Sequence, residues 1–445
     1  MYGAIAISFF TIFFFISWLW LIWRVDVYFG LVYAMLFVYT IFAQFGYYFR
    51  PDISMRIDAY FGEEVFWPYY RLVVLSFTML FVLLSTLGPK LLRYTYYDVG
   101  RSASRLGIVF LLLSLVQWGF LLGVLITRSV ELSYGAASGD EFGSDTLLTV
   151  TGMTFKAMTP DLLVWWYILR EKAWSRFYWP LFGAALILFA TYCLKLGNRT
   201  DILALFLGIG SYEFARAHTN GKLIKWLFRM MLFGGAVICF AMTVDRIRSG
   251  GGDGDSRSME EKLVLNDYYA PSHMLFAAIS YDFVRPGEVV KSNLNNAMIL
   301  RGYPYLQATI TDLFKPGLAT RSQGYAFYIF TEGYLVFGRY GYLYNGIVIF
   351  CGLMMWRMFS LGNSPCVNRF AIMLICAMAA NCVRGQSAYF IKYSYMYFIP
   401  AFLMFYLATG MRLVWPGLVI RRSCTAALKL SNQGQQRNNV KPIRT

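Results

Sequence analysis

Long runs of apolar residues, separated by short polar connections, extend along the chain as far as about residue 413. An α-helix needs about 20 apolar residues to cross a hydrocarbon core of about 30 Å. The runs therefore predict an all-α, polytopic membrane protein with about eleven membrane-spanning helices. We expect these helices at residues 4–23, 28–48, 69–88, 106–127, 154–170, 177–197, 199–216, 225–245, 341–358, 368–385 and 392–413.

Basic residues gather in alternate connections between the expected spans. Lys and Arg are frequent at residues 89–105 and 170–176 and in the C-terminal tail at 414–445. The connections at 49–68 and 128–156 carry both acidic and basic residues instead. Because connections rich in Lys and Arg stay on the cytoplasmic side, we expect the N-terminus outside and the C-terminus inside.

The stretch QGYAFYIFTEGYLVFGRYG, residues 323–341, does not fit this alternation as a span, because the basic tail would then lie outside. It also contains Glu332 and several glycines. We therefore interpret it as a non-spanning, aromatic half-helix at the outer interface, at the end of a large outer loop. The expected divisions are N-terminal helices at 1–245, the large loop at 246–340, C-terminal helices at 341–413 and a basic cytoplasmic tail at 414–445.

The large loop is expected to be partly helical. Ser258 and Glu261 have the spacing of a capping box, and Pro271 then interrupts the helical pattern. We expect Ser272 to cap a second helix. The loop also carries Arg301, which stands beside tyrosines, and Arg321.

The composition excludes several classes of protein. Only 14% of the residues are charged, against about 25% in soluble domains, so the chain belongs in a lipid bilayer. The net charge of +16 forms no long stripe with interleaved aromatic residues, which argues against nucleic-acid binding. None of the seven cysteines forms a C-x-x-C pair, and Asp253-x-Asp255 lies in a Gly-rich stretch, so we predict no metal and no cofactor.

Two arginines stand at the expected outer ends of spans. Arg199 follows Gly197-Asn198 at the start of one span, and Arg384 precedes Gly385 at the end of another. An arginine at a helix end commonly extends its side chain to the membrane surface, which is one interpretation. The other is functional, because guanidinium groups bind phosphate oxygens in a bidentate way. Two such groups on one face would hold a diphosphate without metal.

Two further side chains are candidates for acid–base chemistry. Glu332 lies in an aromatic segment and would serve as a base for an acceptor hydroxyl, or would pair with Arg321 or Arg339 at the rim. His273 is the histidine of the outer loop. A lone histidine is more often structural than catalytic, so both interpretations stay open.

Three segments together resemble the O-antigen polymerases, the Wzy-type polymerases of oligosaccharide repeat units. GNRTDILALFLGIG resembles their Gly-x-Arg segment, and FTEGYLVFGRYGYLYNGIVIF resembles the Glu-x-Tyr-x-x-Phe-Gly-x-x-Gly segment after their large periplasmic loop. NCVRGQSAYF resembles the arginine-bearing turn before their last span. The order and spacing of the three agree, and the resemblance covers about residues 190–410.

This resemblance implies a metal-independent, GT-C-like glycosyltransferase of the bacterial inner membrane, working at the periplasmic face without a cofactor. It would take a glycan from undecaprenyl diphosphate, join it to a second lipid-linked repeat unit, and work with a chain-length regulator protein. On this reading Arg199 and Arg384 hold diphosphate. The substrate-binding residues implied beside them are Asn198, Arg301, Arg321 and Tyr334. Glu332 and Tyr334 line the acceptor side.

Two alternatives remain at this point. The related O-antigen ligases, which transfer the finished chain to lipid A core, often carry a histidine in the large loop, as His273 is here. A transporter or flippase of lipid-linked sugar is the other alternative. Such a transporter is expected to contain internal repeats and broken helices that meet near the middle of the bilayer.

Overall fold

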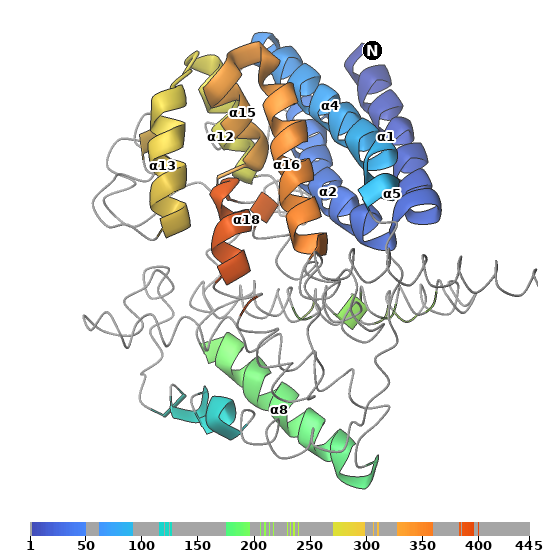
Figure 1. The fold of residues 1–445 in the computed structure, drawn as a ribbon, viewed down its shortest axis with the longest axis vertical. Helices are drawn as coiled ribbons and strands as arrows, with labels where there is room; N and C mark the ends of the chain where they lie inside the picture. The colour runs from blue at the N-terminus through green and yellow to red at the C-terminus, as the bar shows by residue number, and fades with distance from the viewer. Residues whose placement is uncertain are drawn as a thin grey trace, which may run out of the picture.

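The computed structural model describes residues 2–49, 62–91, 175–195, 270–298, 327–358 and 385–395, with isolated positions at 115–126, 205–239, 306–310, 382–383 and 399. Helices account for nearly all of these residues, and no strand occurs among them (Figure 1). The all-α class is therefore confirmed for the described part of the chain.

The helices begin and end near the positions that the apolar runs indicate. Three are long and apolar enough to cross a membrane: Tyr2–Val25, Val27–Phe49 and Glu63–Lys90. The elements are α1 (Tyr2–Trp20), the π-helical η1 (Leu21–Val25), α2 (Val27–Phe49), α4 (Glu63–Thr86), α5 (Gly88–Leu91), α8 (Ser175–Lys195), α12 (Ala270–Ser280), α13 (Pro286–Met298), α15 (Ile329–Phe337), the 3-10 turn η5 (Gly338–Tyr340), α16 (Gly341–Met358) and α18 (Ala388–Tyr393). The helix expected at 341–358 has these bounds in the structure as α16.

The first helix has one buried face and one exposed face, and both are apolar. Ile7, Phe10 and Phe14 are buried against the rest of the bundle. Phe9 and Ile16 lie on the other face and are 69% and 65% exposed. A soluble protein rarely leaves so large an apolar surface in water. Such a face suits contact with lipid, in agreement with a membrane-spanning helix.

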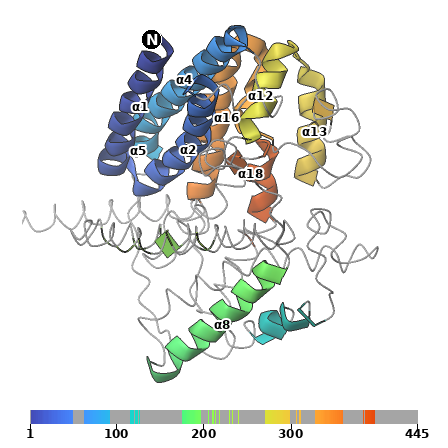
Figure 2. The ribbon, with the colours of Figure 1, turned by 180° about the vertical axis from the view of Figure 1, so that it is seen from behind.

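Helices α1, α2, α4 and α16 pack side by side, as both views of the ribbon show (Figures 1 and 2). Helices α4 and α16 run in the same direction. Asn345, near the start of α16, donates a hydrogen bond from Nδ2 to Ser76 Oγ of α4 at 3.2 Å. Further along, Gly88 lies against Val25, and Arg357 also reaches the turn between α1 and α2. Both helices therefore end at the same end of the bundle.

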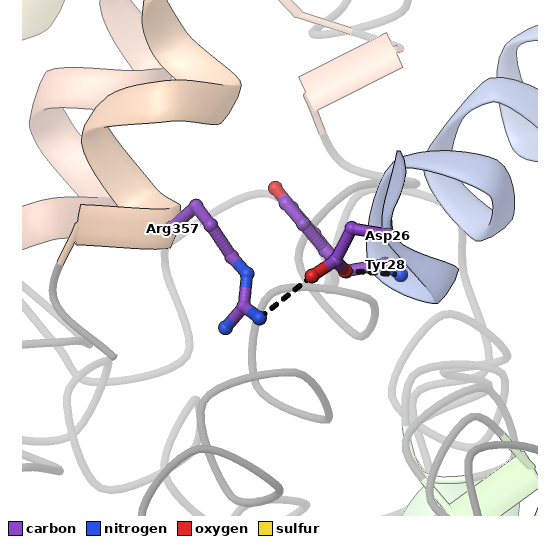
Figure 3. A network of polar contacts seen from close by, with 3 residues as sticks. All are labelled: Asp26, Tyr28 and Arg357. Carbon is purple, nitrogen blue, oxygen red and sulfur yellow. Dashed lines mark hydrogen bonds and ion pairs between the residues drawn. The ribbon is translucent and has the colours of Figure 1, made fainter. Parts of the chain in front are cut away.

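At that end a buried ion pair joins α16 to the turn between α1 and α2. Arg357 Nη2 lies 2.7 Å from Asp26 Oδ2, and the Arg357 side chain is only 2% exposed (Figure 3). Asp26 Oδ1 also accepts the backbone N–H of Tyr28 at 2.8 Å, in the first turn of α2. The Arg357 guanidinium is therefore buried and paired, because α16 ends beside Asp26.

Two short helices from the expected outer loop, α12 and α15, pack against this bundle (Figures 1 and 2). Helix α15 has nine residues and is about 14 Å long, less than half of a hydrocarbon core. Its residues from Ile329 to Leu335 are all buried. The ring of Phe276 in α12 stacks on that of Tyr69, with centroids 4.1 Å apart. The sequence analysis expects the half-helix at an outer interface. In the structure its side chains are buried against neighbouring helices, as aromatic side chains favour, and its position relative to a membrane stays a prediction.

Both short helices begin beside buried hydroxyl groups of α2 and α4. Tyr328 directly precedes α15, and its hydroxyl lies 2.5 Å from Thr40 Oγ1. In the first turn of α12, Ser272 Oγ accepts a hydrogen bond from the Tyr69 hydroxyl at 3.3 Å and donates one to the carbonyl oxygen of Tyr39 at 3.4 Å. Ser272 therefore contacts other helices and does not cap its own, which corrects the expectation from the sequence. Helix α12 begins at Ala270, so Pro271 stands in the first turn, where proline is tolerated.

Candidate functional site

The candidate site is centred on Glu332, a carboxylate with no exposed surface in the first turn of α15. The residue before the helix, Tyr328, has an extended backbone, and its carbonyl oxygen accepts the N–H of Thr331 at 2.8 Å. This turn directs the chain into the helix just before the carboxylate. A negative charge in the first turn of a helix is favoured by the helix dipole.

Four donors from three other parts of the chain surround the carboxylate. Oε1 accepts hydrogen bonds from Asn293 Nδ2 at 2.6 Å, from the Tyr344 hydroxyl at 2.5 Å and from Ser387 Oγ at 2.6 Å. Oε2 accepts the backbone N–H of Ser387 at 2.7 Å. A carboxylate is an acceptor only, so this set of neutral donors matches its hydrogen-bonding needs. The site thus joins α13, α15, α16 and the segment that enters α18.

A second polar contact fixes the same segment to α13. Ser292 Oγ and the Gln386 side chain exchange hydrogen bonds, at 3.0 Å to Gln386 Oε1 and 2.9 Å from Gln386 Nε2. Ser292 Oγ also accepts the backbone N–H of Leu306 at 3.2 Å. One residue earlier, the N–H of Gly385 donates to the carbonyl oxygen of Cys382 at 3.1 Å. Residues 385–387 are therefore held by side chains of two helices.

Glycines bring α15 and α16 unusually close beside Glu332. A Cβ on Gly333 would lie 2.3 Å from the carbonyl oxygen of Gly341, a distance that no side chain tolerates. The Gly333 N–H donates to Asn345 Oδ1 at 3.0 Å, and Asn345 Nδ2 returns a bond to the carbonyl oxygen of Phe330 at 3.0 Å. This close approach brings the Tyr344 hydroxyl within reach of the carboxylate.

Tyr334, which the resemblance groups with Glu332, contacts a different part of the molecule. Its hydroxyl donates to Asp282 Oδ1 at 3.1 Å, in the turn between α12 and α13. Residues two apart on a helix do not share a face. Burial, and then the bond to Asp282, raises the pKa of the Tyr334 hydroxyl to about 12. The expectation that both residues line one acceptor surface is therefore not met by these contacts.

The other expected site residues are placed less completely. His273 is 4% exposed in the first turn of α12. Arg384 lies outside the described residues, although its neighbours Val383 and Gly385 are described. The remaining residues outside the described part are Asn198, Arg199, Arg301 and Arg321. Among the described residues, no three His, Cys, Asp or Glu side chains gather as a metal site requires.

The partners of Glu332 are residues that the sequence analysis does not single out. Asn293, Tyr344 and Ser387 are neutral and come from three separate elements. Polar residues in the run KSNLNN, and the Gln386-Ser387 pair directly after Arg384-Gly385, are the signals that point to them. One polar atom in the group is left over: Asn293 Oδ1 is buried, and no described residue donates to it.

In its described part the protein is all-α, with three helices long and apolar enough to cross a membrane and a buried carboxylate at the junction of several helices. Comparison with protein-family models, with curated protein sequences and with solved structures finds no match to this chain.

Proposed function

We propose that this protein is a glycosyltransferase that polymerises undecaprenyl-diphosphate-linked oligosaccharide repeat units at the periplasmic face of the bacterial inner membrane. The proposal includes about eleven membrane-spanning helices and a GT-C-like arrangement. It includes no metal ion. Its substrates are two lipid-linked glycans, one as donor and one as acceptor.

One observation carries the proposal. The Glu-x-Tyr segment at 330–350 and the arginine-bearing segment at 381–390 resemble two motifs of the O-antigen polymerases. The bonds from Ser387 to Glu332, across 55 positions of sequence, join these two segments in one site. Motifs that serve one reaction must lie together, so this contact supports the proposal.

The proposed chemistry assigns the arginines to the donor. Arg199 and Arg384 hold the diphosphate, for which guanidinium groups are suited by charge and by their two parallel N–H donors. An acceptor hydroxyl oxygen forms the new bond to the anomeric carbon, and the bond from that carbon to the diphosphate oxygen breaks. The hydroxyl proton passes to a base, and undecaprenyl diphosphate leaves with the electron pair. The arginines stabilise the negative charge that develops on it.

Substitution of the two arginines tests this assignment. We expect Arg199→Ala and Arg384→Ala to insert normally and to abolish chain lengthening, so that cells display lipid A core with a single repeat unit. Lysine at either position should restore little activity, because the bidentate geometry is lost. With purified undecaprenyl-linked repeat unit, the reconstituted wild-type protein should give a ladder of products on a gel. Loss of all attached units in the variants would indicate a ligase and would contradict the proposal.

One structural feature favours the transporter alternative. Helices α12 and α15 are short, and both begin inside the bundle, beside Thr40 and Tyr69. Broken helices of this kind form the substrate sites of many transporters. The two functions separate in proteoliposomes: a transporter moves lipid-linked glycan across the bilayer without lengthening it, whereas the polymerase lengthens glycan already on the outer leaflet.

A further inference from the structure

We infer that Glu332 is a positioning residue: its carboxylate fixes the Gln386–Ser387 segment, which continues directly from Arg384, and it does not take the proton of the acceptor. This inference rests on the proposed function and assigns a role within the same site.

The hydrogen bonds leave little room for Glu332 to act as a base. Oε1 already accepts three hydrogen bonds, and Oε2 accepts the Ser387 N–H. The side chain has no exposed surface. A general base must come within hydrogen-bond distance of the proton that it removes. Oε2 could accept one more hydrogen bond, but an acceptor hydroxyl would have to open the contact between α13, α15 and α16 to reach it, because the carboxylate is fully buried.

The same bonds are well suited to hold a segment in place. Ser387 gives both its backbone N–H and its hydroxyl to one carboxylate, which fixes the position and the orientation of this residue. Gln386 is fixed independently by Ser292. In the sequence, Arg384 is separated from this held pair of residues by Gly385 alone. A shift of about 1 Å in a group that positions substrate can reduce a rate about 100-fold.

The first measurement is the pH profile of chain lengthening by reconstituted wild-type protein and Glu332→Gln. The glutamine has the same shape as glutamate, but its NH₂ group is a donor and replaces an oxygen that accepts hydrogen bonds from the surrounding donors. We expect activity to fall at least 10-fold with a raised KM for the lipid-linked donor. The acid limb of log(kcat/KM) against pH should be retained, because the base is another group. Disappearance of that limb in Glu332→Gln would overturn the inference.

The second measurement is a double-mutant cycle with Ser387→Ala, which removes one donor to Glu332. If Glu332 acts through Ser387, the double variant should be no less active than Glu332→Gln alone. Losses that multiply would show that Glu332 acts independently of Ser387 and would overturn the inference. Ser76→Ala is the matched control, because Ser76 is also a buried serine, bonds Asn345 and has no contact with the 385–387 segment. It should combine additively with Glu332→Gln.

A third measurement does not depend on catalysis. Arg384→Cys is prepared in otherwise wild-type protein and together with Glu332→Gln, and both proteins are labelled with a charged maleimide. The extent of labelling at position 384 is measured by mass spectrometry of the peptide that contains this position. We expect the labelling rate to change at least 3-fold when Glu332 is replaced, and to stay unchanged with Ser76→Ala. If the labelling rate is unchanged in Glu332→Gln as well as in Ser76→Ala, the positioning role is overturned. If the wild-type protein makes no ladder while the labelling rate responds to Glu332, then the proposed function fails and the positioning role stands.

Discussion

Glu332 and Arg357 are both charged side chains that the helical bundle buries almost completely, with 0% and 2% exposed surface. They lie towards opposite ends of α16: Glu332 contacts Tyr344 in its first turn, and Arg357 stands in its last. Their partners differ. Arg357 meets an opposite charge, Asp26, whereas Glu332 meets four neutral donors.

This difference suggests that Arg357 stabilises the fold, whereas Glu332 belongs to the candidate functional site. The Arg357–Asp26 pair is neutral as a whole and ties the end of α16 to the turn before α2. Among the described residues, no cation pairs with Glu332. Ionisable groups inside membrane proteins are costly and commonly mark functional sites. We therefore expect Arg357 to control stability and Glu332 to control activity.

The largest effect is expected from Arg357→Met, which leaves the Asp26 carboxylate without its cation. Removing one partner of a buried ion pair typically costs 3–5 kcal/mol. We expect about 3 kcal/mol here, because Asp26 retains 15% of its side-chain surface. The loss of stability is measured by thermal unfolding of the detergent-solubilised protein, in which size-exclusion chromatography reports the folded fraction after heating.

The double variant Asp26→Asn/Arg357→Met is the control for this prediction. It removes both charges and should regain most of the lost stability, because no unpaired charge remains buried. If the double variant is as unstable as Arg357→Met, then packing of the arginine side chain, rather than charge pairing, holds this end of α16.

The next effect is expected from Gly333→Ala, beside Glu332. The new methyl group would meet the carbonyl oxygen of Gly341 and Asn345 Oδ1 at 2.3 Å, so α15 must move away from α16. Overpacking of this kind typically costs 1–3 kcal/mol, and we expect about 2 kcal/mol by thermal unfolding. Activity should fall as well, since the shift moves Glu332 relative to Tyr344.

Gly183→Ala in α8 is the matched control, because a Cβ there meets nothing within 4 Å. It should leave stability unchanged or raise it slightly, since alanine favours helix more than glycine does. A loss as large as that of Gly333→Ala would show that the close approach of α15 and α16 is not the cause.

The sequence predicts α16 well and the short helices poorly, for a physical reason. The run from Gly341 to Met358 is apolar apart from Asn345 and Arg357 and follows a glycine-rich turn, so its own residues determine its bounds. The placement of α12 depends on distant residues, such as Tyr69, on which the Phe276 ring stacks. A largely apolar run of 11 residues with one aromatic side chain suits a surface helix and a buried short helix equally, and the run alone does not distinguish them.

The same reasoning applies to the candidate site. Glu332 can be singled out from the sequence, because a carboxylate inside an apolar segment is rare. Its partners cannot, because asparagine, tyrosine and serine are common and lie 39, 12 and 55 positions away. Only the fold shows that these neutral donors converge on one carboxylate.

A smaller effect is expected from Tyr344→Phe, which removes one of the four donors to Glu332 but keeps the ring. Hydrogen bonds between helices in membranes contribute about 0.6 kcal/mol on average, and bonds to charged groups contribute more. We therefore expect a loss of about 1 kcal/mol in thermal unfolding. Because three donors remain, the carboxylate should keep hold of Ser387, and the labelling rate at position 384 should change less than in Glu332→Gln. An equal change would mean that Tyr344, rather than the carboxylate, orders the segment.

The smallest effect is expected from Tyr334→Phe, on the same short helix. The lost hydroxyl bond goes to Asp282, an exposed residue in the turn between α12 and α13, where water can replace the missing donor. The loss of stability should therefore be about 0.5 kcal/mol or less, below that of Tyr344→Phe measured under the same conditions. A larger loss from Tyr334→Phe would contradict the comparison, since it would place the stabilising bond of α15 at the exposed turn instead of at the buried carboxylate.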